Sequence, residues 1–115
     1  MKKKYQFMAL ATAMPGKLEE LKHWYDTQHL PDCLKLDGFV SAQRFDVVGK
    51  PMGMEAPDFE VLAIYVLETD NVEECLAQIP KVARTPAMPF TDSIDLTRSV
   101  RFVVSEAQPP QYPKT

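Results

Sequence analysis

Apolar residues recur along the chain in four extended runs and two helical runs. The extended runs cover residues 5–13, 38–48, 59–67 and 96–104, and segments that contain Gly or Pro separate most of them. The helical runs cover residues 18–29 and 70–80, where apolar side chains return every three or four positions. The order β-α-β-β-α-β predicts a ferredoxin-like α+β fold.

Prolines and acidic residues indicate where the two helices begin and end. Pro31 lacks the backbone N–H that a helix needs, so the first helix should end or kink there, with one further turn from Pro31 to about Leu36. Asp70 and Glu73 have the spacing of a capping box, which predicts that Asp70 caps the second helix. Pro80 should end that helix.

The predicted sheet has more apolar surface than one chain can cover. In this fold four antiparallel strands lie in the order 4-1-3-2, and both central strands are apolar at odd and even positions alike, whereas the fourth alternates as a half-solvated edge does. Two helices cover one face only, and each large apolar side chain left in water forgoes about 1.5–3 kcal/mol. We therefore expect a homodimer whose second copy covers the open face. The alternative is a monomer in which the loop Gly49–Asp58 or the C-terminal tail folds over that face.

Chain length and net charge limit the number of domains and the kinds of partner that we expect. The 115 residues suit a single domain, placed at residues 1–107 and followed by a proline-rich tail at 108–115. A net charge of -3 does not favour nucleic acid or anionic lipid as partners, and no apolar run is long enough to span a bilayer. Residues 2–13 resemble a secretory signal, but Gln6 and Thr12 interrupt the apolar run and cleavage would remove the first strand, so a cytoplasmic location is predicted. Cys33 and Cys75 have no metal-ligand spacing and are predicted to be buried, reduced thiols.

Most residues capable of chemistry gather in the segment from His23 to Asp32. Tyr25 and His29 follow Leu21 at intervals of four on the stripe that begins on the core side, which places His29 at the boundary between helix and sheet. A histidine partly withdrawn from water there can act as a general acid or base close to neutral pH, with Asp32 orienting its ring. Two structural interpretations stay open, in which His29 donates to terminal helix carbonyls and Asp32 complements the helix dipole.

Other side chains have both a binding and a structural interpretation. Trp24 is either a ligand platform or a core anchor, and Tyr65 places its hydroxyl either in a cavity or at the rim of the core. Arg44 either closes a pocket against an anionic group or, as the residues favour, pairs with Asp46 or Glu60 at the surface. His23 should be solvated. His23 and His29 lack i, i+4 spacing and no cysteine completes a ligand set, so no metal site or cofactor is predicted.

The motif Trp24-Tyr25-Asp-x-x-His29-Leu-Pro-Asp32, followed by Gly-Phe-Val-Ser-Ala-Gln-Arg44-Phe, resembles the EthD-like family of the dimeric α+β barrel superfamily. The likeness covers the first half of the chain closely and the second half mainly by pattern. It implies a protomer whose sheet packs on the sheet of its mate. It also places the family's histidine, aspartate, aromatic pair and strand arginine on His29, on Asp32, on Trp24 with Tyr25, and on Arg44.

Three functions are compatible with these residues. The first is a cofactor-independent lyase, dehydratase or cyclase that acts on a small aromatic or carbonyl compound, with His29, Asp32 and Tyr25 as catalytic residues and Trp24, Arg44 and Tyr65 binding the substrate. The second is a non-catalytic dimer that binds a small apolar or aromatic ligand. The third, implied by the wider superfamily, is a cofactor-free monooxygenase. A cavity at His29 would favour the first, and a histidine with both ring nitrogens satisfied would favour the second.

Overall fold

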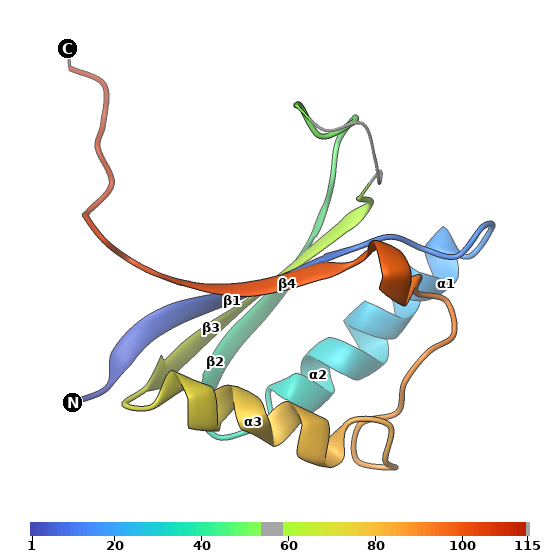
Figure 1. The fold of residues 1–115 in the computed structure, drawn as a ribbon, viewed down its shortest axis with the longest axis horizontal. Coiled ribbons are helices and arrows are strands. Elements are labelled where there is room, and N and C mark those ends of the chain that lie inside the picture. The colour runs from blue at the N-terminus through green and yellow to red at the C-terminus, as the bar shows by residue number, and fades with distance from the viewer. Residues whose placement is uncertain (54–58, 115) are drawn as a thin grey trace.

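The computed structural model describes residues 1–53 and 59–114 and shows one four-stranded sheet with helices on one face (Figure 1). The strands are β1 (Lys3–Ala11), β2 (Phe39–Asp46), β3 (Val61–Thr69) and β4 (Val100–Ser105). The helices are α1 (Leu18–Trp24), a π-helical turn (Tyr25–His29), α2 (Leu30–Cys33), α3 (Val72–Val82) and a short 3-10 turn (Leu96–Arg98).

All neighbouring strands pair antiparallel in the order β2-β3-β1-β4. This confirms the ferredoxin-like topology and the prediction that the first and third strands are central. Both central strands bury alternate side chains under the helices, and these are Ala9, Ala11, Val61, Ala63, Tyr65 and Leu67. The same periodicity places the intervening side chains on the opposite face of the sheet.

The opposite face of the sheet is apolar, and no helix covers it (Figure 1). The register places one row of four apolar side chains straight across all four strands: Phe45, Leu62, Leu10 and Val100. The next row contains Ile64, Met8 and Phe102 beside a glutamine of β2. At the two edges of the sheet Phe45, Val100 and Phe102 remain 37%, 46% and 41% exposed.

Neither segment proposed to cover this face in a monomer does so within the described residues. The chain after β4 has no regular structure, every described residue in it is exposed, and Figure 1 shows it running away from the sheet. In the loop after β2, Val48 and Met52 are 93% and 97% exposed. Residues 54–58 of the predicted loop lie outside the described part of the chain.

The sequence predicted that the first helix ends or kinks at Pro31. In the structure the helix continues past this residue. The helical path runs without a break from α1 through the π-helical turn into α2, which carries Pro31 in its first turn and ends at Cys33. The ring of a proline inside an α-helix clashes with the carbonyl four residues earlier, here that of Thr27. A wider turn before Pro31 relieves this clash, so the helix continues where a kink was expected.

The start and end of α3 also differ from the prediction. The N-cap is Asn71, not Asp70, because the Asn71 side chain accepts a hydrogen bond from the backbone N–H of Glu74 at 3.1 Å. Pro80 lies inside the helix, which continues to Val82. Within the described residues, no helix is both long and apolar enough to cross a membrane.

Candidate active site

A pocket of about 320 Å³ lies between the helix-facing side of the sheet and the elements packed on it. Its floor is formed by β1 and β3, and one wall by the π-helical turn with the helical residues on either side of it. The other walls are formed by α3, the segment from Arg84 to Leu96 and the start of β4. Its lining is mostly apolar and aromatic. Pockets of this kind, with a few polar groups, are the usual sites for small ligands.

The π-helical turn positions two of the three predicted catalytic residues, Tyr25 and His29, on the pocket wall. The backbone N–H of Leu30 donates to the carbonyl of Tyr25, five residues back instead of four. The hydroxyl of Thr27 donates to the carbonyl of His23 at 2.7 Å. Extra residues in a helical turn change the direction of the side chains that follow, and such turns are frequent at functional sites.

His29 lies among aromatic rings. Its imidazole stacks on the indole of Trp24, with ring centroids 4.3 Å apart and 15° between the planes. Tyr25 and Tyr65 approach edge-on, at centroid distances of 5.7 and 6.4 Å. The structure therefore brings together four of the six predicted site residues, His29, Tyr25, Trp24 and Tyr65, around one pocket.

The two ring nitrogens of His29 differ in their contacts. Nε2 lies 3.7 Å from the thiol sulfur of Cys33, and Nδ1 is the one buried side-chain nitrogen or oxygen among the described residues that has no hydrogen-bond partner. Burial lowers the pKa of His29 to about 4; the charge of Asp32 opposes this shift and that of Arg101 adds to it. This pKa lies below the near-neutral range in which His29 was expected to act as an acid or base. The ring is neutral at pH 7 because desolvation outweighs the nearby carboxylate.

The phenol and thiol groups near His29 keep their protons. Burial raises the pKa of Tyr25 to about 12 and that of Cys33 to about 12, and it raises the pKa of Tyr65 well above its ordinary value. Cys33 and Cys75 are buried free thiols, as predicted. At neutral pH the two tyrosines can donate hydrogen bonds but cannot act as bases.

The segment from Arg84 to Ile94 closes the pocket, although the sequence predicted no helix, strand or site residue in it. The indole Nε1 of Trp24 donates to the carbonyl of Pro89 at 3.2 Å, which ties this segment to the end of α1. Met88 is buried, and Phe90 packs edge-on against Trp24. Ser93, fully buried, donates to the carboxylate of Glu20. Trp24 thus holds both the histidine ring and the covering segment.

Arg101 of β4 also lines the pocket and was missed as a site residue. It pairs in register with Ala9, whose side chain faces the helices, whereas its neighbours Val100 and Phe102 point to the open face. The sequence carried a signal for Arg101, because apolar and polar residues alternate along β4 and Arg101 occupies a polar position. It was interpreted as the polar side of a solvated edge, because the covering segment could not be located from sequence.

Two predicted site residues, Asp32 and Arg44, do not line the pocket. Asp32 is 6% exposed and accepts a hydrogen bond from the Gln28 amide at 2.6 Å, with Lys35 at 3.6 Å. No hydrogen bond joins Asp32 to His29 among the described residues, so the ring-orienting role has no contact to support it.

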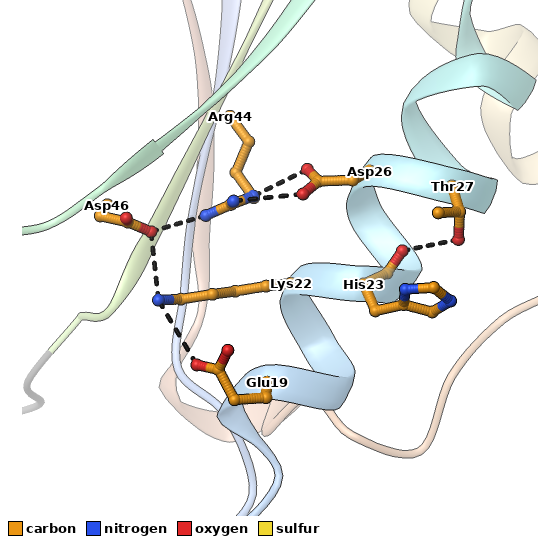
Figure 2. Close-up of polar contacts among 7 residues, drawn as sticks. All are labelled: Glu19, Lys22, His23, Asp26, Thr27, Arg44 and Asp46. Carbon is orange, nitrogen blue, oxygen red and sulfur yellow. Dashed lines mark hydrogen bonds and ion pairs between the residues drawn. The ribbon is translucent and has the colours of Figure 1, made fainter.

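Arg44 belongs to a surface ion-pair network (Figure 2). Its guanidinium donates to Asp26 at 2.8 and 3.2 Å and to Asp46 at 2.6 Å. Lys22 lies 3.3 Å from the same Asp46 carboxylate and 3.7 Å from Glu19. The favoured prediction of surface pairing with Asp46 is confirmed, and Asp26 rather than Glu60 is the second partner. In Figure 2 the ring of His23 points away from this network, and His23 is exposed, as predicted.

Metal-ligating side chains do not gather at this site. Across residues 1–53 and 59–114, no group of three or more His, Cys, Asp or Glu side chains is arranged to hold a metal ion.

Two solved structures share this fold. A putative monooxygenase from Shewanella loihica PV-4 superposes with a TM-score of 0.64 at 8% identity, covering 95% of this chain and 99% of its own. An ethyl tert-butyl ether D (EthD) family protein from Bacillus halodurans C-125 superposes with a TM-score of 0.59 at 18% identity, covering 92% and 99%. No protein-family model and no curated protein sequence matches the chain. The predicted likeness to EthD-like proteins is thus confirmed at the level of the fold.

Proposed function

We propose that the pocket binds a small, mostly apolar aryl carbonyl compound and that His29 removes a proton from the carbon beside the carbonyl group. The observation that supports this proposal is that His29 lines the pocket while its buried Nδ1 has no hydrogen-bond partner among the described residues. Leaving a buried polar atom unpaired costs about 1–3 kcal/mol, and a catalytic role is one of the explanations for such an atom in a native fold. A histidine with both nitrogens satisfied, as the structural interpretation required, is not found.

His29 is suited to receive a proton because its neighbours cannot. Among the ionisable residues that line the described pocket, only His29 combines a neutral form at pH 7 with a free nitrogen. A pKa of about 4 makes it a weak base when the pocket holds no anion. During proton transfer, negative charge develops on the substrate oxygen beside the imidazole. This charge favours the imidazolium form and so raises the pKa of His29.

The remaining pocket groups complete the step. Tyr25 and Tyr65 hold their protons and donate hydrogen bonds to the enolate oxygen, and Trp24 fixes the plane of the imidazole. The enolate then has two outcomes. It expels a β-hydroxyl group, which leaves as water when His29 returns the proton, or it attacks a second carbonyl of the same molecule and closes a ring. These outcomes correspond to a dehydratase and a cyclase, and neither requires a cofactor.

The test uses β-tetralone in deuterated water, with loss of its α-proton signals followed by NMR. Wild-type protein should accelerate exchange over buffer, and His29→Gln should abolish the acceleration while its melting temperature stays near that of wild type. The matched control is His23→Gln, which changes the exposed histidine of the same helix and should leave the exchange rate unaltered. Binding of β-tetralone without exchange would contradict the proposal and favour the non-catalytic binding dimer.

A second candidate is suggested by the fold shared with the Shewanella monooxygenase-like protein. Removal of the hydroxyl proton from an electron-rich phenol yields a phenolate with carbanion character at a ring carbon. That carbon can react with dioxygen, so that one oxygen atom enters the substrate as a carbonyl and the other leaves as water. An oxygen electrode distinguishes the two functions. Oxygen consumption that matches substrate loss supports the monooxygenase, and turnover without oxygen consumption supports the lyase.

We also propose that two chains pair through the open sheet face, as the apolar rows across β2, β3, β1 and β4 require. The support is the absence of any cover from the described residues of the chain, together with about 40% exposure of large side chains at both edges of the sheet. Sedimentation at micromolar concentration should give a particle of twice the 13.1 kDa chain mass. A 13.1 kDa particle would contradict the pairing.

A further inference from the structure

The pocket carries positive charge and no negative charge. Two arginines, Arg84 and Arg101, lie in its lining, and no Asp or Glu does within the described chain. The chain as a whole has the opposite balance, with 16 acidic and 13 basic residues. The cationic lining is therefore a local feature of the pocket and does not follow from composition.

The four arginines of the chain divide by their partners. Arg44 and Arg98 pair with carboxylates, at 2.6 Å from Asp46 and 4.0 Å from Asp95. The side chain of Arg101 makes no ion pair or hydrogen bond with any described residue, although its charge acts on Tyr25, His29 and Tyr65. Arg101 is exposed, so it can offer the five donors of its planar fork to a ligand that carries a carboxylate.

Arg84 is held at the same pocket by its neighbours. Its backbone has a φ of 65°, the one positive value outside glycine among the described residues, and its N–H donates to the carbonyl of Met88 at 3.0 Å. Its guanidinium carbon lies 4.0 Å from the centre of the Phe90 ring. A left-handed backbone is unfavourable for a non-glycine residue, so the fold keeps this cation over the ring at an energetic cost.

We propose that the ligand of this pocket is an aryl carboxylate whose carboxylate binds Arg101 at the mouth, while its ring lies among the apolar side chains near Trp24. This inference rests on the proposed function, since it names the substrate class of the same site. A guanidinium binds a carboxylate through two parallel hydrogen bonds, which suits the planar, unpaired fork of Arg101. Arg84 adds positive potential at the covering segment, and the carboxylate offsets the lowering effect of Arg101 on the pKa of His29.

The test compares β-naphthoate with β-naphthamide, which has the same rings and no charge, by isothermal titration in low salt. Wild-type protein should bind the carboxylate at least about tenfold more tightly than the amide, as expected for charge-assisted hydrogen bonds at a partly exposed site. Arg101→Gln should bring the two dissociation constants within about twofold by weakening only the carboxylate. Arg101→Lys should retain part of the preference, because it keeps the charge and loses the fork.

The matched control is Arg98→Gln, which removes an equal charge near β4 from an arginine outside the pocket lining. It should leave both dissociation constants unaltered. Equal affinity of wild type for the two probes, failure of wild type to bind β-naphthoate, or equal weakening of both probes by Arg101→Gln would each overturn the inference. Charge preference without any α-proton exchange would overturn the proposed function alone, and exchange without charge preference would overturn this inference alone.

Discussion

Protonation of His29 should destabilise the fold as the pH falls. Burial lowers the pKa of the folded-state imidazole from 6.5 to about 4. Below about pH 6.5, His29 therefore binds a proton in the unfolded chain but not in the folded chain. The free energy of unfolding decreases as the pH falls, until His29 is also protonated in the folded state near pH 4. The stability present above pH 6.5 is progressively lost across this window.

The size of the effect follows from the width of the window. A shift of about 2.5 pH units corresponds to about 3 kcal/mol when the whole window is crossed, and to about 2–3 kcal/mol between pH 7.5 and pH 4.5. Carboxylates also titrate near the lower limit. The quantity to compare is therefore the difference in unfolding free energy between wild type and His29→Gln, in which contributions common to both proteins cancel.

Urea unfolding at fixed protein concentration, followed by circular dichroism at several pH values between 7.5 and 4.5, measures this difference. Wild type should lose about 2–3 kcal/mol relative to His29→Gln between the two limits. His23→Gln should instead follow wild type, because His23 is exposed. If the difference in unfolding free energy between wild type and His29→Gln does not change with pH, the account of a desolvated, neutral imidazole is refuted.

Three further changes test other parts of the structure. Gly38→Ala should lower the free energy of unfolding by about 2–3 kcal/mol, because its new Cβ would lie 2.9 Å from the Cys75 sulfur. Gly49→Ala, also at positive φ but in open space, should lower it by about 1 kcal/mol. Equal losses in urea unfolding would contradict the crowding at Gly38. Ile64→Asp, at the middle of the open face, should convert a sedimenting dimer into a 13.1 kDa monomer, and an unchanged dimer would place the interface elsewhere. Arg44→Gln should cost about 1 kcal/mol and leave the β-naphthoate dissociation constant unaltered, and weaker binding would return Arg44 to the site.

The topology was predictable because it depends on features that a single sequence carries. Both parities of the central strands are apolar, and Gly and Pro separate most of the elements, so the order of elements and the open face follow from alternation alone. The cluster of Trp24, Tyr25 and His29 was predictable for a similar reason, since all three lie on one short helical segment. Tyr65 joined them because the central position of its strand was already determined.

The parts that were missed depend on long-range packing. The π-helical turn was not predicted. The turn before Pro31 can form hydrogen bonds to the fourth or to the fifth preceding residue, and the local sequence does not decide between two forms that differ little in energy. The orientation of Arg101 depends on the register of β4 against β1. The pKa of His29 depends on its burial among elements that are distant in sequence, Tyr65 of β3 among them.

The central claim is that the ligand lies in the pocket beside His29, on the helix-facing side of the sheet. Isotope-filtered nuclear Overhauser measurements on labelled protein with unlabelled β-naphthoate test it directly, because methyl groups mark both faces. Contacts should join the ligand rings to Ile79 and Met88, which line the pocket, and not to Leu62 or Ile64 on the opposite face. Contacts to Leu62 and Ile64 alone would contradict the claim and place binding on the open sheet face.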